Sequence, residues 1–292
     1  PATNQLPPSF SKPTEEELLS VEIQALAELH RLKLCVNSGI TVHRANSSVV
    51  ISGYVQSQDQ QDHLSGVLQG IGRPEIIDVR LSYPSQNEEV VIGASPFPTA
   101  SSARIAPPIE SWLRENLRVG TRTSERELFN LMNAVVLESE QVSGEAWALR
   151  HLAQQFPPDR TRHLSPFLNE QLLKMVDGHT TALREGLQTL QSRIEPVLGG
   201  LPAESGHPLA DSSRAPWQSR AVALQLRVEP AVNQVFDWFS VAGPVAPRAN
   251  SQTMSGALAM LNSLQIEIRD CLAAAGKLKV VAQNREAANG LP

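Results

Sequence analysis

The chain has 292 residues, a formal net charge of −5 and 41% hydrophobic residues. This length is enough for two ordinary domains, and the charged fraction of 19% is typical of a globular rather than a disordered chain. The acidic balance argues against a nucleic-acid binder or a polybasic membrane-surface protein. Only two cysteines are present, far apart in the sequence, which excludes a disulfide framework and a zinc cluster. There is no stretch of 18 apolar residues that could span a bilayer, but the chain begins without Met, so we expect that a signal or anchor could precede it.

The N-terminal region predicts a tether followed by a helix. Residues 1–13 contain four prolines and show no periodicity, which indicates a flexible tether. From Thr14 onward, apolar residues recur at helical spacing behind three consecutive glutamates, which favour the start of a helix because they oppose the positive end of its dipole. The expected apolar face consists of Leu19, Ile23, Leu26 and Leu29.

Two strands, a helix and a third strand are predicted next. Alternating residues over 40–43 and 49–55 predict two strands, which Asn46, Ser47 and Ser48 connect as a hairpin turn. Ser57 and Gln60 have the spacing of a capping box before a helix that ends at Gly72. Residues 77–81 alternate again and predict the third strand. The predicted order is therefore helix, strand, strand, helix, strand.

This order, together with the segments VVISGYV at 49–55 and IIDVRL at 76–81, resembles a BON domain over residues 14–83. Gly53 matches the glycine of that family's strand, and residues 57–71 match its helix. The turn Gly72-Arg73-Pro74 departs from the usual pattern. The resemblance implies a non-catalytic module of the bacterial envelope that binds proteins or membrane surfaces. Without it, the same residues predict a small α+β sandwich with a glycine at a close-packed strand position.

Residues 84–107 are rich in proline and serine and are predicted to be an interdomain linker, with Val90, Val91 and Ile92 as one possible edge strand. Residues 108–288 are predicted to form an all-helical domain, and 289–292 a tail. Pro107-Pro108 opens a short helix that carries Ile109, Trp112, Leu113 and Leu117.

Long helices with alternating steps of three and four are the strongest pattern in the sequence. One begins at Ser124 and stops at Pro157-Pro158, and a second begins at Ser165-Pro166, an N-cap followed by a proline at the first helical position. Its core positions are Leu173, Val176, Thr180, Leu183, Leu187, Leu190, Ile194 and Val197. The alternation returns at Trp217, Ala221, Leu224, Val228, Ala231, Val235 and Trp238, despite Pro230, and again from Ala257 to Leu278. These patterns predict an antiparallel helical bundle or a pair of long helical hairpins.

The sequence predicts no catalytic residues, no cofactor and no metal site. Its single Glu-x-x-His, from Glu204 to His207, lies in a Gly/Pro-rich loop, where that spacing has no helical meaning. There is no nucleophile elbow, phosphate loop or dinucleotide fingerprint. His179 and Thr180 form a polar break in an apolar stripe, which we interpret as a register-setting layer rather than a ligand site. Cys35 and Cys271 are both expected to be buried.

Apolar residues cover both sides of one predicted helix at Val235, Phe236, Trp238 and Phe239. Such a double face has to pack against two neighbours or meet a partner, so we take these four as candidate partner-binding residues.

The prediction is a non-catalytic interaction or sensory region of a bacterial envelope protein, periplasmic or extracytoplasmic, for example in a membrane-anchored regulator of the anti-sigma type. Its partner would be a protein or a second copy through the helices, with no nucleic acid, and membrane contact only through a segment outside this sequence. One alternative is an enzyme or ligand-binding protein with Tyr54, His43, Arg80 and Trp112 around a site between sheet and helices. The other is a cytoplasmic coiled-coil scaffold.

Overall fold

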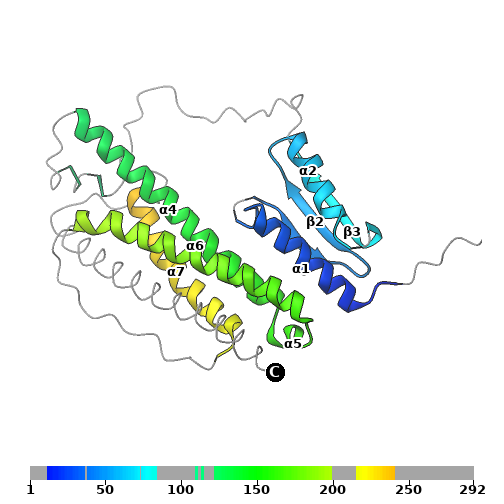
Figure 1. The fold of residues 1–292 in the computed structure, drawn as a ribbon. Helices are drawn as coiled ribbons and strands as arrows, with labels where there is room; N and C mark the ends of the chain where they lie inside the picture. The colour runs from blue at the N-terminus through cyan, green and yellow to red at the C-terminus, as the bar shows by residue number, and fades with distance from the viewer. Residues whose placement is uncertain are drawn as a thin grey trace, which may run out of the picture. The chain divides into compact units, whose positions relative to one another are not determined.

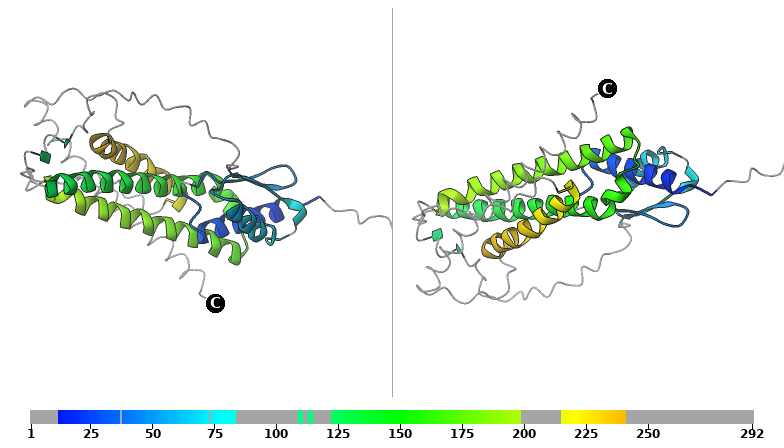
Figure 2. Two further views of the ribbon diagram at one scale, coloured as in Figure 1. Left: turned by 90° about the horizontal axis from the view of Figure 1, so that it is seen from above. Right: turned by 90° about the horizontal axis from the view of Figure 1, so that it is seen from below.

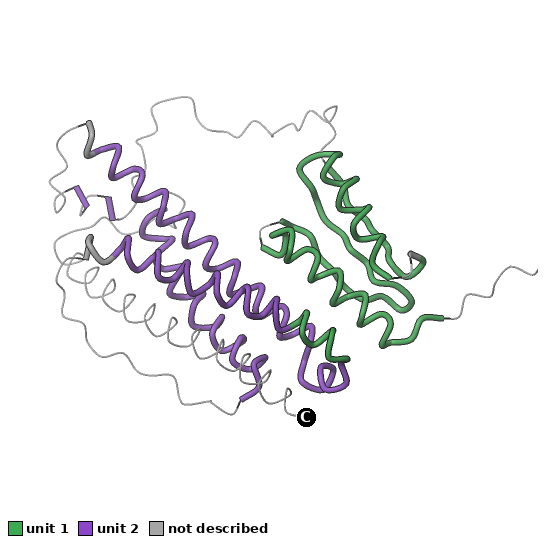
Figure 3. The backbone as a smooth tube through the Cα atoms, viewed as in Figure 1, with its two compact units in different colours: residues 1–94, 165–172 green, residues 95–164, 173–292 purple. Residues whose placement is uncertain are grey.

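The protein is a mixed α+β structure with one small sheet and several long helices (Figure 1). The computed structural model describes residues 12–36, 38–72, 74–83, 109–110, 113–114, 122–198 and 215–240. The chain divides into two compact units (Figure 3). The sheet unit comprises residues 1–94 and 165–172, and the helical unit comprises residues 95–164 and 173–292. Three predicted segments lie outside the described residues: the linker at 84–107, the helical pattern from 257 to 278 and the tail at 289–292.

The first helix, α1 (Glu15–Arg31), begins where the three glutamates predict a helix start, and the structure identifies Thr14 as its N-cap. The Glu17 amide donates to the Thr14 hydroxyl, and the Glu17 carboxylate accepts from the Thr14 amide, so this is a complete capping box. Ile23, Leu26 and Leu29 are buried as predicted, whereas Leu18 and not Leu19 completes the buried face.

The sheet contains β1 (Thr41–Arg44), β2 (Val49–Tyr54) and β3 (Ile77–Ser82) in spatial order β1-β2-β3. β2 pairs antiparallel with β1 and parallel with β3. The parallel pairing requires a crossover, which α2 (Gln58–Gln69) and the 3-10 turn η1 (Pro74–Ile76) supply. Val42, Ile51 and Val79 share one register line on the face that also carries the buried Val49 and Leu81.

The capping at α2 differs in one bond from a full capping box. The Gln60 amide donates to the Ser57 hydroxyl as predicted, but the Gln60 side chain accepts from the amide of Gln56. The helix therefore begins where the sequence indicates, and Leu64 and Leu68 are buried on its inner side.

Gly53 lies at a point of close backbone approach. A Cβ at this position would lie 2.7 Å from Cα of Ile40 and closer still to the carbonyl oxygen of Gly39. The neighbouring atoms belong to the backbone, which cannot move aside as a side chain can. The structure therefore supports the expected close-packed strand glycine.

The helical unit contains α4 (Arg122–Gln155), the single turn α5 (Pro158–Thr161), most of α6 (Pro166–Leu198) and α7 (Trp217–Phe239). Side-chain contacts show that α4 runs antiparallel to α6 and to α7 (Figure 2). The amide of Leu168 donates to the Ser165 hydroxyl, which confirms the predicted N-cap of α6.

The core positions predicted from the alternating steps of three and four form one buried stripe, here called a seam, along each of α6 and α7. All the α6 core positions from Leu173 to Ile194 are buried, and so are those of α7 from Trp217 to Val235, whereas Trp238 is half-buried. Pro230 is exposed on the outer side of α7. The amide hydrogen that proline lacks is therefore missing on the outer side of the helix and not in its seam.

Candidate interaction site at the end of the helical unit

The predicted partner-binding cluster occupies the last turn and a half of α7, and the structure divides it into two parts. Val235 and Phe239 are buried in the helical unit, so they belong to its core and offer no accessible surface. Phe236 and Trp238 are half-buried, with the exposed Asp237 between them. Only Phe236 and Trp238 therefore have surface available to a partner.

Ile109 lies at this end of α7. The amide of Ile109 donates to the carbonyl oxygen of Trp238 at 3.3 Å, and the amide of Leu113 donates to the carbonyl oxygen of Ile109 at 2.9 Å. The second bond confirms the predicted helical turn after Pro108. Carbonyl groups in the last turn of a helix have no partner within that helix, so the bond from Ile109 satisfies one of them. Ile109 and Leu113 are fully buried.

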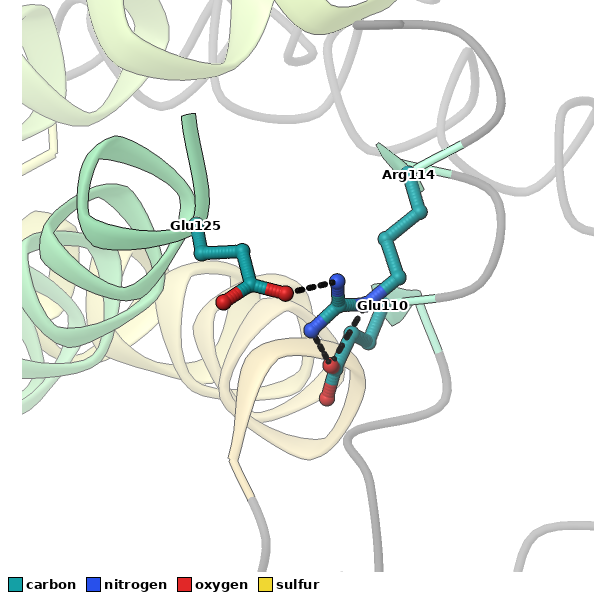
Figure 4. Close-up of polar contacts among 3 residues, drawn as sticks. All are labelled: Glu110, Arg114 and Glu125. Carbon is teal, nitrogen blue, oxygen red and sulfur yellow. Dashed lines mark hydrogen bonds and ion pairs between the residues drawn. The ribbon is translucent and has the colours of Figure 1, made fainter. Parts of the chain in front are cut away.

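Three charged residues tie this turn to the beginning of α4 (Figure 4). Arg114 donates through Nε and Nη2 to Oε1 of Glu110, at 2.8 and 2.6 Å. Its Nη1 lies 3.4 Å from Oε1 of Glu125 in the first turn of α4. Arg114 thus bridges two carboxylates, one almost fully buried and one exposed. The hydrogen bonds to Glu110 raise the pKa of Arg114.

Two buried oxygen atoms near this junction make no hydrogen bond within the described residues. One is Oε2 of Glu110, and the other is Oγ of Ser240, the residue that caps the end of α7. A buried carboxylate oxygen without a donor is costly.

The residues of the alternative ligand site lie partly on the open face of the sheet. The strand registers place Tyr54, His43 and Arg80 on the side opposite Ile51, and Tyr54 is 73% exposed. Arg80 forms an ion pair with Asp78, and this hydrogen bond lowers the pKa of Asp78. Trp112, the fourth candidate, lies outside the described residues, as do Glu204, His207 and Cys271.

The polar break at His179 and Thr180 lies in the interior. His179 is 4% exposed, and its Nδ1 lies 2.7 Å from Oε2 of Glu145 on α4. The Thr180 hydroxyl donates to the carbonyl oxygen of Val176. The predicted polar layer is thus present, and its partner comes from α4. Cys35, expected to be buried, is half-buried.

The sequence analysis missed two polar groups that join α4 to α7. Arg150 donates to Oε1 of the buried Gln225 at 2.6 Å and lies over the ring of Trp147. Gln218, also buried, donates to the carbonyl oxygen of Phe156. Both glutamines lie one position beside a core residue of the α7 seam, and that adjacency is the signal that could have found them. The pair Glu110 and Arg114 could have been found from its spacing of four.

Comparisons of the chain with protein-family models, curated proteins and solved structures gave no match. Within the part of the chain that the structure describes, no helix combines the length and the apolar character that crossing a bilayer requires.

Proposed function

We propose that the chain is a non-catalytic interaction region whose partner-binding surface is the end of α7. The observation that carries this proposal is the arrangement at Phe236 and Trp238, where a helix already packed through Val235 and Phe239 keeps two aromatic side chains half-exposed. Tryptophan is enriched among the residues that contribute most to binding energy at protein interfaces, and phenylalanine is enriched in interfaces generally. The long helices would form a bundle or hairpins that hold this surface rigid.

The sheet unit is proposed to be a BON-like docking module. Its order of helix, strand, strand, helix, strand supports this, and so does Gly53 at a close-packed position on the central strand. That resemblance is the ground for proposing an envelope location, periplasmic or extracytoplasmic. The proline-rich tether predicted at residues 1–13 is the ground for proposing a role in a membrane-anchored regulator of the anti-sigma type.

The interior polar groups support a structural rather than a catalytic role. Glu145 with His179, and Arg150 with Gln225, each join one helix to another. An enzyme or ligand-binding site that involves Tyr54, His43 and Arg80 remains the second hypothesis, because these three share an exposed sheet face.

Photo-crosslinking in the native host tests the proposal. A photoreactive residue replaces Asp237, between the two aromatic side chains, or Ser219, exposed on the same helix, as a matched control. We expect a discrete adduct from position 237 that disappears in the Trp238→Ala chain and does not form from position 219. Equal labelling at both positions would contradict an interaction surface at the end of α7.

The scaffold hypothesis makes a different prediction for the full chain. Light scattering after size exclusion would give a dimer or larger species if the helical seams pair between chains. A monomer would indicate that the described seams are satisfied within one chain, as the burial of their core positions favours.

A further inference from the structure

We propose that the outer side of the α4–α7 pair, at Trp147, Arg150 and Leu226, is a docking surface for an amphipathic helix of a partner protein that carries a carboxylate on its apolar side. We call it the Arg150 surface. It lies on other turns of α7 than Phe236 and Trp238 and does not rest on the proposed function. Two observations carry it: a cation without a counter-ion within the described residues, and exposed apolar side chains that border this cation.

Arg150 is a half-buried cation that its neighbours hold in one orientation. Its Nη1 donates to Oε1 of Gln225 at 2.6 Å, and its Cζ lies 5.0 Å from the centre of the Trp147 ring. Gln225 is itself fixed, because it is fully buried and donates through Nε2 to Oε2 of Glu229 at 2.6 Å. The guanidinium is therefore oriented before a partner binds, which reduces the side-chain entropy that binding would cost.

The charge of Arg150 is not paired within the part of the chain that the structure describes. No described carboxylate lies within ion-pair distance of its guanidinium, and Glu229 is connected to it only through Gln225. The Nε–H group of Arg150 is buried and has no acceptor among these residues. A guanidinium matches a carboxylate best, because the planar group can donate a pair of parallel hydrogen bonds to the two oxygens. The chemistry of Arg150 therefore specifies a carboxylate as the missing partner.

Apolar side chains border Arg150 on both helices. On α4, Trp147 is 44% exposed although its ring contacts the guanidinium. On α7, Leu226 is 56% exposed and Val222 is half-buried. Val222, Leu226 and Glu229 follow one another at steps of four and three, so they share one side of α7. Because Glu229 accepts from the glutamine that also holds Arg150, that side adjoins Arg150.

These features specify the partner. An acidic residue of a partner helix would meet Arg150, and apolar residues three or four positions away on that helix would cover Trp147 and Leu226. The covering side chains would exclude water from the ion pair, which strengthens it. Tryptophan and arginine are also the residue types that contribute most to binding at protein interfaces.

Selection from a phage-displayed library of helical peptides, randomised on one side, is the direct test. Peptides are selected for binding to the full chain after depletion on the full chain carrying Trp147→Ala. We expect the survivors to carry Asp or Glu with an apolar residue three or four positions away, and to bind Arg150→Lys at least roughly tenfold more weakly. They should bind Leu137→Ala unchanged, because Leu137 is 65% exposed on a different side of α4 from Arg150. No survivors, survivors without an acidic residue, or unchanged binding to Arg150→Lys would overturn the inference.

A second pair of variants keeps the inference testable if Arg150→Lys disturbs the contact with Gln225. Leu226→Lys and Leu226→Asp both replace an exposed apolar side chain, so they differ from each other in charge. We expect the selected acidic peptide to bind Leu226→Lys at least roughly fivefold more tightly than Leu226→Asp at low salt, and the difference to shrink at high salt. Leu137→Lys and Leu137→Asp are the matched control pair and should not differ. Equal affinity for the two Leu226 variants, or the reverse order, would refute a partner carboxylate at this place.

Self-association of the unaltered chain that Trp147→Ala abolishes, measured by light scattering after size exclusion, would also overturn the assignment and identify a second copy as the occupant. The outcomes are distinct from those of the proposed function. Failure of acidic peptides to bind at Arg150 leaves an adduct at position 237 unaffected, and absence of that adduct leaves peptide binding at Arg150 unaffected.

Discussion

Gly186 of α6 lies directly against Val142 of α4, so that a Cβ at position 186 would be 2.7 Å from Cγ2 of Val142. Real Cβ atoms do not approach a neighbour so closely, and Val142 is fully buried. The same Cβ would lie 3.2 Å from Oε1 of Glu138. The absence of a side chain at position 186 therefore allows these two antiparallel helices to approach closely at Val142.

Gly186→Ala is expected to destabilise the helical unit by about 1–3 kcal/mol. The added methyl group would push α4 and α6 apart, and this penalty exceeds the stabilisation that the higher helix propensity of alanine provides. Hydrogen exchange of α4 and α6 amides measures the effect of Gly186→Ala, and exchange of α2 amides measures that of the control. Gly66→Ala is the matched control: Gly66 is also within a helix, α2, but a Cβ there meets nothing within 4 Å. This control is expected to gain roughly 0.5–1 kcal/mol. A stabilised Gly186→Ala chain would show that the helices are not held at this distance.

Glu138 is expected to make the helical unit less stable as the pH rises. Burial raises the pKa of Glu138, and the charge of Arg193 opposes this only in part. The folded state therefore binds the proton more tightly than the unfolded state. Stability is lost as the pH rises from the ordinary glutamate pKa through the raised one. Glu138→Gln should remove this loss, so its unfolding free energy should exceed that of the unaltered chain at neutral pH and converge with it in acid. Glu140→Gln, at an exposed position on α4, is the control.

The pair of Arg44 on β1 and Glu22 on α1 is expected to matter far more than a surface pair. Nε of Arg44 lies 2.8 Å from Oε2 of Glu22, whose side chain is 3% exposed. Arg44→Leu would leave a buried carboxylate without its cation, and we expect a loss of about 3 kcal/mol in the sheet unit. Arg31→Leu removes the exposed pair with Glu28 and should cost less than about 0.5 kcal/mol. The free energies of unfolding of the two variants are compared by hydrogen exchange of β1 and α1 amides at increasing denaturant concentration. Equal losses of stability in both variants would contradict the expectation.

Gly53→Ala is expected to prevent the sheet from forming at its centre, because the added Cβ would collide with the backbone of residues 39 and 40. A loss of roughly 4 kcal/mol or more is expected, which in a small unit is close to complete unfolding. Gly39→Ala provides the comparison, since a Cβ there meets nothing within 4 Å and only the φ of +66° opposes it. Its expected cost is about 1–2 kcal/mol. Circular dichroism and amide protection of β2 measure both, and a folded β2 in Gly53→Ala would disprove the close approach.

The sequence by itself determined the elements and their inner faces. The helices α1, α2 and α6 begin where the acidic first turn after Thr14, the cap Ser57 and the cap Ser165 predict them. Alternating steps of three and four mark the buried seams of α6 and α7. These features are local, because a cap is satisfied within one turn and a seam is a property of one helix. The turn α5 and the shift from Leu19 to Leu18 were missed, since short turns and the exact edge of a buried face depend on what packs against them.

Only the tertiary structure decided which residues meet. Glu145 opposite His179, Arg150 beside Gln225, and Gly186 against Val142 are pairs that depend on which helices adjoin and in which direction they run. The candidate interaction site also depends partly on the sequence pattern and partly on the tertiary structure. The aromatic cluster on α7 was visible as a sequence pattern. Contacts between segments far apart in the chain, however, bury Val235 and Phe239 and form the hydrogen bond from Ile109 to Trp238. Periodicity records which side of a helix is apolar, and it carries no information about what covers that side.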